Sequence, residues 1–164
     1  MAWMFEQASS FNQPLAWDTS RVTDMSDMLN SAAAFNQPLR LDTSSATTLR
    51  SLLAAAISFN QPLNLTDTSQ VTSMFGMFHL ARAFNQPLFE WDTSSVTSMA
   101  WMFEQASSFN QPLAWDTSRV NDMTRMFAGA TSFSQPLHWN TSSADTQDMF
   151  DGASSFNLSL ANFT

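Results

Sequence analysis

The sequence predicts a repeat protein of the α/β class, a solenoid whose coils each contain one short helix and one short parallel strand. The phrase Phe-Asn-Gln-Pro-Leu begins at Phe11, Phe35, Phe59, Phe84 and Phe109 and returns altered at Phe133 and Phe156. The interval between successive copies is nearly constant. A fixed period of this kind indicates stacked units that bury their apolar faces against each other. Within each copy, apolar spacing changes from three or four residues to alternation, so we expect about seven coils in one domain over residues 1–164.

The first element of each repeat is expected to be a helix. In one repeat, apolar residues at steps of 3, 3, 1, 3 and 3 are Val96, Met99, Met102, Phe103, Ala106 and Phe109. This spacing describes one face of a helix over about residues 96–106. The Asp-Thr-Ser at residues 92–94 offers side-chain oxygens that cap the first free amides. Every repeat has alanine at the position of Ala106, which predicts a close approach of backbones there.

The second element is expected to be a short strand. Pro112 ends the helical run and biases Gln111 toward extended geometry, and Leu113 and Trp115 then point to one side. Stacked copies would form a narrow parallel sheet. Residues 63–67 and 88–92 carry one extra residue each, which we expect in a turn.

An asparagine follows the phenylalanine of the repeated phrase in six copies: Asn12, Asn36, Asn60, Asn85, Asn110 and Asn157. Because asparagine is costly to bury unpaired, we predict that each bonds the backbone of the next coil. Ligand binding from these positions is the alternative.

The pattern Val-Thr-Ser-Met-x-x-Met-Phe-x-x-Ala-x-x-Phe-Asn-Gln-Pro-Leu-x-x-Trp-Asp-Thr-Ser resembles the repeats of BspA-type leucine-rich-repeat surface proteins, above all the mycoplasma-lipoprotein-type repeat of unknown function. The match covers essentially residues 1–164. The resemblance implies a right-handed leucine-rich-repeat-like solenoid, surface exposure and a role in adhesion or interaction, and it implies no catalytic residues. The chain departs from the family in its few glycines and in the leucines that replace Met-Met-Phe in residues 49–53.

Composition excludes several classes of partner. The net charge is −8 and the chain has no lysine, which argues against nucleic acid and against an anionic membrane as partners. No apolar run approaches about 18 residues, so we expect no membrane insertion. Without cysteine there is no disulfide and no thiolate metal site. We expect no cofactor. No signal peptide is visible, because residues 1–22 already belong to the repeats; the expectation of an extracellular or cell-surface location rests on the resemblance.

Two tryptophans are candidate binding residues. Trp3 and Trp101 occupy a repeat position that elsewhere holds Asp27, Ser51, Gly76 or Arg125, so we expect them to be exposed contact residues. A separate column of tryptophans contains Trp17, Trp91, Trp115 and Trp139. It could form a carbohydrate-stacking platform, but Leu41 and Leu65 replace tryptophan in this column, which favours a core position.

The polar columns have both structural and ligand-binding interpretations. The aspartates at Asp18, Asp42, Asp67, Asp92 and Asp116 could bind calcium, but capping of helices explains them and also Asn140, so no metal site is predicted. Rows of threonines could bind ice, although turn bonding explains them too. Possible N-glycosylation sites are Asn64, Asn140, Asn157 and Asn162. His79 and His138 are isolated in sequence.

The predicted function is therefore a non-enzymatic surface-interaction, adhesion or structural assembly module, with a protein or glycan partner that the sequence does not identify. A carbohydrate-binding or ice-binding solenoid is the alternative. An enzyme would need a unique, non-repeated constellation, and none is apparent. Residues 1–22 are identical to residues 99–120, so the first coil is built like an internal one. We expect a longer array or end-to-end self-association, which could build filaments.

Overall fold

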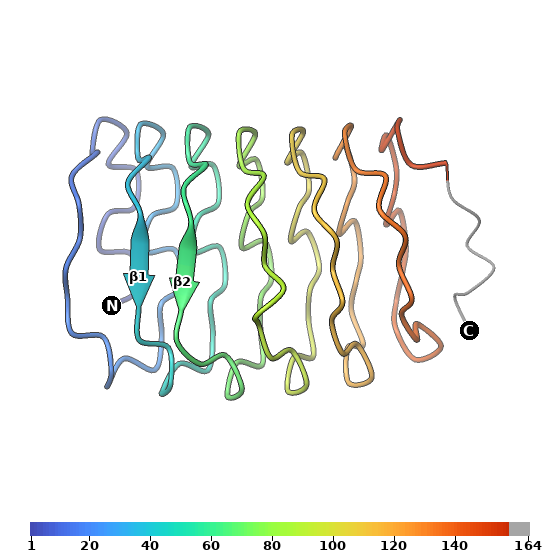
Figure 1. Cartoon of the computed structure of the whole chain (residues 1–164), viewed down its shortest axis with the longest axis horizontal. Coiled ribbons are helices and arrows are strands. Elements are labelled where there is room, and N and C mark those ends of the chain that lie inside the picture. The colour runs from blue at the N-terminus through green and yellow to red at the C-terminus, as the bar shows by residue number, and fades with distance from the viewer. Residues whose placement is uncertain (158–164) are drawn as a thin grey trace.

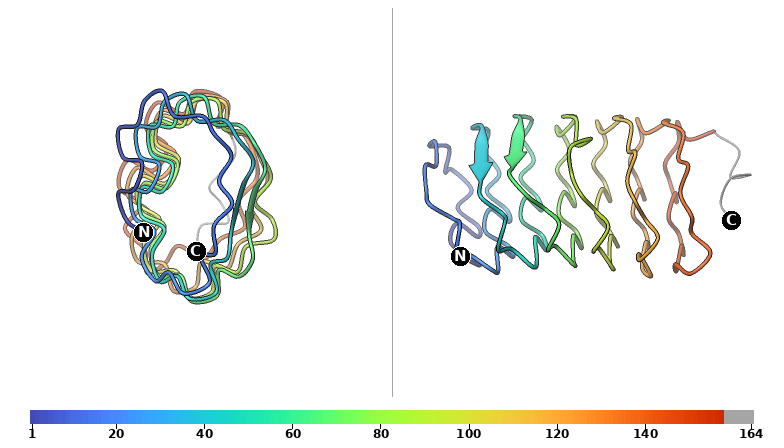
Figure 2. Two further views of the ribbon diagram at one scale, coloured as in Figure 1. Left: turned by 90° about the vertical axis from the view of Figure 1, so that its left-hand side faces the viewer. Right: turned by 60° about the horizontal axis from the view of Figure 1, so that its bottom comes forward.

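A computed structural model describes residues 1–157, in which the chain runs through successive coils stacked along one axis (Figure 1). Seen end-on, the coils superpose on one outline (Figure 2). We number the coils by residue range: coil 1 is 1–24, coil 2 is 25–48, coil 3 is 49–73, coil 4 is 74–98, coil 5 is 99–122, coil 6 is 123–145 and coil 7 is 146–157. Isolated parallel bridges join the coil boundaries at Asp24, Thr48, Ser73, Ser98, Asp122 and Asp145.

The prediction of a helix and a strand in every coil is wrong. Residues 1–157 contain no helix and two strands, β1 (Leu39–Leu41) and β2 (Leu63–Leu65). These strands pair in parallel, with Leu39 opposite Leu63. Within residues 1–157, no helix is long and apolar enough to cross a membrane. The architecture is a stack of largely irregular coils, and a leucine-rich-repeat-like helix–strand solenoid is not what this sequence forms.

The expected helices are absent because two residues in each coil, four positions apart, have left-handed backbone angles. Trp101 and Gln105 have φ angles of 61° and 59°, in the left-handed region that interrupts a right-handed helix. The same two positions are left-handed in the other coils, at Trp3, Gln7, Asp27, Ser31, Ser51, Ala55, Gly76, Leu80, Arg125, Gly129, Asp148 and Gly152. Since glycine fills only three of these fourteen positions, the sequence carries little local sign of them.

Hydrogen bonding in this segment alternates between turns and neighbouring coils. The amides of Met102, Glu104 and Ala106 donate to carbonyls three residues earlier, at 3.0 to 3.2 Å. The intervening amides donate to the next coil, from Met99 to Asp122, Trp101 to Thr124, Phe103 to Met126 and Gln105 to Ala128. A helix would have used these amides within its own segment. The apolar spacing fits both arrangements, because each buries the same side chains.

Strands form only where leucine replaces tryptophan in the tryptophan column. In coils 4 to 6, the rings of Trp91, Trp115 and Trp139 stack at centroid distances of 6.1 and 6.3 Å. No ladder joins these three segments. The indole N–H groups of Trp115 and Trp139 bond the Leu88 and Leu113 carbonyls instead, at 3.1 and 3.3 Å. Leu41 and Leu65 are small enough to let β1 and β2 pair.

The interior consists of the Met, Phe, Ala and Leu columns. Phe59, Phe84 and Phe109 are fully buried and stack with centroids 5.8 and 6.0 Å apart, and Ala106 is also fully buried. The predicted asparagine ladder is confirmed. The side-chain oxygens of Asn12, Asn36, Asn60, Asn85 and Asn110 each accept the backbone N–H of the equivalent residue in the next coil, at 2.9 or 3.0 Å.

Candidate functional site

One group of side chains stands out from the repeated surface, and we call it the Trp101 cluster. It contains Arg50, Phe75, His79, Trp101, Glu104 and Arg125. These residues come from coils 3 to 6 and lie on the face formed by the left-handed turns. They occupy equivalent or adjacent positions in neighbouring repeats, so the stacking of coils brings them together.

The polar half of the Trp101 cluster is centred on Glu104, which is only 7% exposed. Its Oε1 accepts a hydrogen bond from Arg125 Nε at 2.9 Å and lies 2.8 Å from Arg125 Nη2 in an ion pair. Its Oε2 lies 3.1 Å from His79 Nδ1, at an angle outside the hydrogen-bond range. Burial lowers the pKa of His79, and the Glu104 carboxylate opposes that shift only in part. The bond to Glu104 raises the pKa of Arg125.

The aromatic half of the Trp101 cluster forms a partly exposed platform. The ring of Trp101 lies 5.6 Å from that of Phe75 and 5.9 Å from that of His79. The guanidinium carbon of Arg50 lies 4.3 Å from the centre of the Phe75 ring, within the range of a cation–π contact. Arg50 forms no ion pair with any residue in the described part of the chain. The platform therefore offers aromatic surface beside an unneutralised cation.

Trp101 holds a conformation that its side chain does not favour. A left-handed φ of 61° costs a non-glycine residue about 1–2 kcal/mol, and the equivalent residue in coil 4 is Gly76. The side chain stays 38% exposed, so burial offsets this strain only in part. Every coil has this left-handed position, so the exposed side chain and its contacts with Phe75 and His79 are what make Trp101 the strongest candidate contact residue.

The structure separates the two predicted binding tryptophans. Trp3 is 60% exposed and makes no ring contact within residues 1–157, whereas Trp101 joins the cluster. The tryptophan column offers no platform in coils 4 to 6, because Trp91, Trp115 and Trp139 are buried in the core. Of the possible glycosylation sites, Asn64, Asn140 and Asn157 are exposed, and Asn162 lies outside the described residues.

The aspartates do not cap helices, contrary to the prediction. Asp116 Oδ1 accepts the backbone N–H of Ser118 at 2.9 Å, which closes a local turn. Asp18, Asp42, Asp67, Asp92 and Asn140 make the same bond. Bonds from the serine lower the pKa of each of these five carboxyls. Among residues 1–157, no group of three or more His, Cys, Asp or Glu could hold a metal ion.

The threonine rows serve contacts between coils. Buried hydroxyls at Thr19, Thr43, Thr68, Thr93 and Thr117 donate to carbonyls of the next coil. A second row, at Thr47, Thr72 and Thr97, is exposed, and its hydroxyls donate to carbonyls of the preceding coil.

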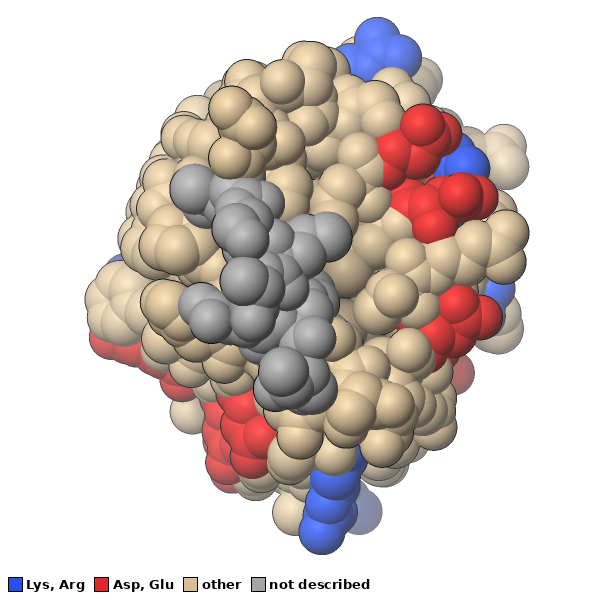
Figure 3. Space-filling view, turned by 90° about the vertical axis from the view of Figure 1, so that its right-hand side faces the viewer, with Lys and Arg blue, Asp and Glu red and all other residues tan. Residues whose placement is uncertain are grey.

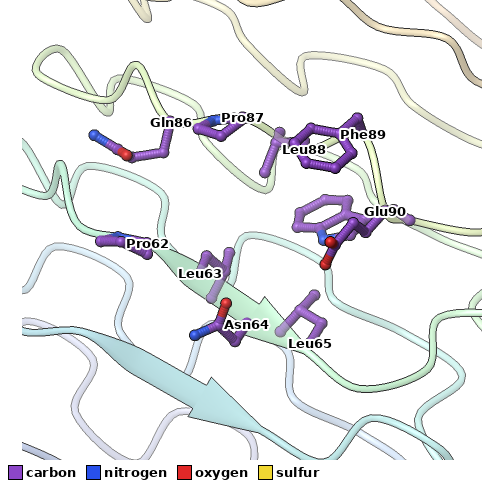
Figure 4. A pocket seen from close by; sticks show the side chains of 10 residues that line it. Pro62, Leu63, Asn64, Leu65, Gln86, Pro87, Leu88, Phe89 and Glu90 are labelled. Atoms are coloured by element: carbon purple, nitrogen blue, oxygen red, sulfur yellow. The ribbon is translucent and has the colours of Figure 1, made fainter.

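A groove of about 240 Å³ lies between β2 and residues 86–91 (Figure 4). It forms where the two repeats with an extra residue are neighbours. The extra residue of coil 3 follows Leu65, and that of coil 4 falls between Leu88 and Trp91, where Phe89 and Glu90 lie in a turn as expected. Since Leu88 and Trp91 both face the core, Phe89 points outward and is 66% exposed. This groove is a second surface feature outside the regular repeat.

Sequence reasoning found Trp101 but missed its neighbours. We expected His79 to be isolated, yet it lies against Glu104. The available signal was position, because His79 and Glu104 occupy the same place in adjacent repeats. Phe75 and Phe89 were also missed, because single hydrophobic residues on a surface are common.

Comparison with known proteins gives one family. The family described as mycoplasma protein of unknown function, DUF285, matches residues 1–87 and again residues 64–163. No curated protein and no solved structure matches the chain significantly.

Proposed function

The chain belongs to the DUF285 family, and we propose that it is a non-enzymatic interaction module that binds a protein partner through the Trp101 cluster. The observation that carries the proposal is an exposed tryptophan that contacts non-repeated aromatic side chains beside a group of charged ones. Tryptophan and arginine are enriched at the energetic centres of protein interfaces.

The bonding of Glu104 supports binding over catalysis. A general base must reach the proton it removes, but one oxygen of Glu104 accepts a hydrogen bond from Arg125 and forms an ion pair with it, and the other oxygen faces His79. The carboxylate is also nearly buried. These residues hold one another in place, and Glu104 thereby positions Arg125 and His79 beside the aromatic platform.

We place this activity at the cell surface, as adhesion or assembly. The support is the resemblance of the repeats to BspA-type leucine-rich-repeat surface proteins, a finer assignment than the DUF285 match and one that belongs to the proposal.

The proposal includes self-association end to end, through coil 1. In coil 5, the carbonyls of Ala100, Met102 and Glu104 accept amides of coil 4 at 2.9, 2.9 and 2.8 Å. The equivalent carbonyls of Ala2, Met4 and Glu6 accept no bond from residues 1–157, and the Met4 side chain is 50% exposed. This edge has the chemistry to receive another coil.

Self-association is tested by light scattering over a range of protein concentrations. The acidic side chains that gather around the other end of the stack (Figure 3) should repel a neighbour, so we expect the mass to rise with both protein and salt concentration. Met4→Glu places a charge on the edge and should abolish the rise. A wild-type mass that stays monomeric at micromolar concentration contradicts this part of the proposal.

A carbohydrate ligand at Trp101 is the second candidate function. The exposed indole could stack on a sugar ring, with Arg50 and Arg125 as hydrogen-bond donors. Ice binding rests on the exposed row Thr47, Thr72 and Thr97, but those hydroxyls donate within the protein.

Partner binding is tested by screening a displayed peptide library and a glycan array with three proteins: wild type, Trp101→Gly and Trp3→Gly. Trp101→Gly relieves the left-handed strain while losing the packing on Phe75, so stability should change by less than about 1 kcal/mol. We expect peptide ligands that bind wild type and Trp3→Gly but not Trp101→Gly. Trp101-dependent glycan ligands alone would replace the protein-partner proposal with the carbohydrate one. If every ligand binds Trp101→Gly as well as wild type, or if neither screen yields a ligand, both the protein-partner and the carbohydrate proposals are overturned.

A further inference from the structure

We propose that the groove beside β2 binds an extended peptide that carries a basic residue, and that the peptide pairs with the free edge of β2. This site is separate from the Trp101 cluster. Figure 4 shows β2 on one side of the groove and the side chains of residues 86–90 on the other. The inference depends on the backbone of β2, on the walls of the groove and on its charge.

The edge of β2 that faces coil 4 has no backbone partner. On the other edge, the Pro62 carbonyl accepts the Leu39 amide and the Thr66 amide donates to the Leu41 carbonyl. In a parallel ladder of this register, Asn64 also faces β1, so the amides and carbonyls of Leu63 and Leu65 face the groove. None of these four groups bonds any residue in the described part of the chain.

The unpaired groups of Leu63 belong to a nearly buried residue, as do those of Trp115 and Trp139 in later coils. Leu63 is only 6% exposed, and more than nine in ten buried backbone polar groups are paired in native proteins. In coil 4, the Leu88 carbonyl accepts the indole N–H of Trp115 in coil 5 and is therefore engaged away from β2.

The edge of β2 is a better site than that of β1. On the far side of β1 the same register leaves Arg40 as the only residue within the strand that faces outward, whereas β2 presents Leu63 and Leu65. Two residues at alternating positions provide the donor–acceptor spacing that an added strand requires.

The walls of the groove define the peptide. Phe89, which is exposed, and Leu65, which is partly exposed, supply apolar contacts, and the nearly buried Leu63 and Trp91 lie at the floor of the groove. Glu90 is the only charged residue among the lining residues, all of which lie in the described part of the chain. It is exposed and forms no ion pair with residues 1–157. A peptide with small apolar residues around one arginine or lysine therefore fits both the walls and the charge.

Ordered water is the competing explanation for the unpaired groups. A groove of about 240 Å³ has room for several waters, and waters could bond the amides of Leu63 and Leu65. Water would satisfy these groups without selecting for peptide sequence or backbone. The two explanations therefore differ in their response to an added peptide.

The probe is the blocked pentapeptide Thr-Val-Arg-Val-Thr, compared with Thr-Val-Glu-Val-Thr and with the arginine peptide N-methylated at alternate residues. Each is titrated into the whole protein, and backbone amide exchange and chemical shifts are followed by NMR. We expect the arginine peptide to slow exchange of the Leu63 and Leu65 amides. The glutamate and N-methylated peptides should bind at least about tenfold more weakly. Unchanged exchange at millimolar peptide, or equal binding of the N-methylated peptide, overturns the proposal in favour of water.

Leu65→Trp is the sharpest variant, because it restores the residue that this column holds in coils 4 to 6. The added indole should fill the groove against Trp91 and abolish peptide binding. Glu90→Gln and Phe89→Ala alter exposed side chains, so they test the site even if Leu65→Trp folds poorly; each should weaken the arginine peptide several-fold. Ser107→Ala changes a side chain outside the groove, so it is the control and should bind as wild type. Binding that survives all three groove variants overturns the proposal and leaves the proposed function of Trp101 untouched.

Discussion

Residues 1–22 and residues 99–120 are identical in sequence but sit in different surroundings, coil 1 with a neighbour on one side and coil 5 with neighbours on both. Their backbones agree: the left-handed angles are 58° and 60° in coil 1 and 61° and 59° in coil 5. The burial of equivalent side chains differs between the two copies. Met4 is 50% exposed where Met102 is fully buried, and Glu6 is exposed where Glu104 is not.

This comparison separates two kinds of property. Turn conformations and local bonds recur in both copies of the shared segment. Burial, ion pairing and aromatic clustering depend on which coil lies next to them. Glu104 has Arg125 and His79 as neighbours, while Glu6 meets neither residue type. Substitutions at matched positions can therefore show which property is local.

The largest difference is expected between Phe103→Ala and Phe5→Ala. Phe103 is fully buried and stacks at 5.5 Å on both Phe78 and Phe127, so its removal should cost about 3–5 kcal/mol. Phe5 is only partly buried and should cost less than half as much. Urea unfolding of the two variants measures the difference. Equal losses would mean that another coil covers coil 1 in solution.

The second-largest difference in the free energy of unfolding is expected between Ala106→Leu and Ala8→Leu. Ala106 is fully buried, and overpacking at such a site costs about 1–3 kcal/mol or more. Ala8 is partly exposed, so a larger side chain can turn outward with a smaller loss. Ser107→Ala is a control that should stay within about 0.5 kcal/mol. Equal melting temperatures for Ala106→Leu and the control Ser107→Ala would contradict the close approach of coils at the alanine column.

Glu104→Gln should cost about 1–2 kcal/mol, since it removes the ion pair and weakens the charge-assisted hydrogen bond to a partly exposed arginine. Glu6→Gln should change stability by less than about 0.5 kcal/mol. The Glu104→Gln variant also removes the carboxylate that raises the pKa of His79, so that pKa should fall further, as measured by NMR titration.

The pKa of His79 also determines a pH dependence of stability. Because the folded pKa lies below the ordinary 6.5, the stability from neutral His79 is present above pH 6.5 and is lost as pH falls through the folded value. The loss should start at the same pH in Glu104→Gln but continue to a lower pH. No change in the titration of His79 would show that Glu104 does not act on it in solution.

The smallest effect should be the same in both copies. Asp18 and Asp116 accept local bonds from Ser20 and Ser118, which lower the pKa of each carboxyl. Their contribution is present above about pH 4 and is lost as pH falls through the lowered values. Asp18→Asn and Asp116→Asn keep the accepting oxygen, as Asn140 does. Each variant should lose less stability than the wild type as the pH falls, and the reduction should be the same in both. A clear difference between the two would show that the bond is not local.

Sequence reasoning succeeded where the repeat itself carries the information. The period predicted stacked units, and the asparagine column predicted a ladder that the structure contains. It failed for secondary structure. The apolar spacing around Met102 and Phe103 buries the same residues in a helix as in turns, and left-handed residues such as Trp101 give no sign in their side chains.

The strand prediction failed for a physical reason visible only in the stack. Leu113 and Trp115 alternate as strand residues do, but each tryptophan stacks on the next and bonds a leucine carbonyl. Strands form only at Leu41 and Leu65, where that side chain is small. The Trp101 cluster could be predicted only in part, because its members are spread along the chain from Arg50 to Arg125.

The repeat period, the membership of the core columns and the residues that bond within one turn depend on neighbours along the chain, so they can be read from the amino-acid sequence. The path of the backbone, the exposure of each copy and the two irregular surfaces depend on contacts between coils. Each coil directs half of the amides in its left-handed segment to the next coil and packs its side chains on the same neighbour. The Trp101 cluster and the groove beside β2 both arise where adjacent coils differ.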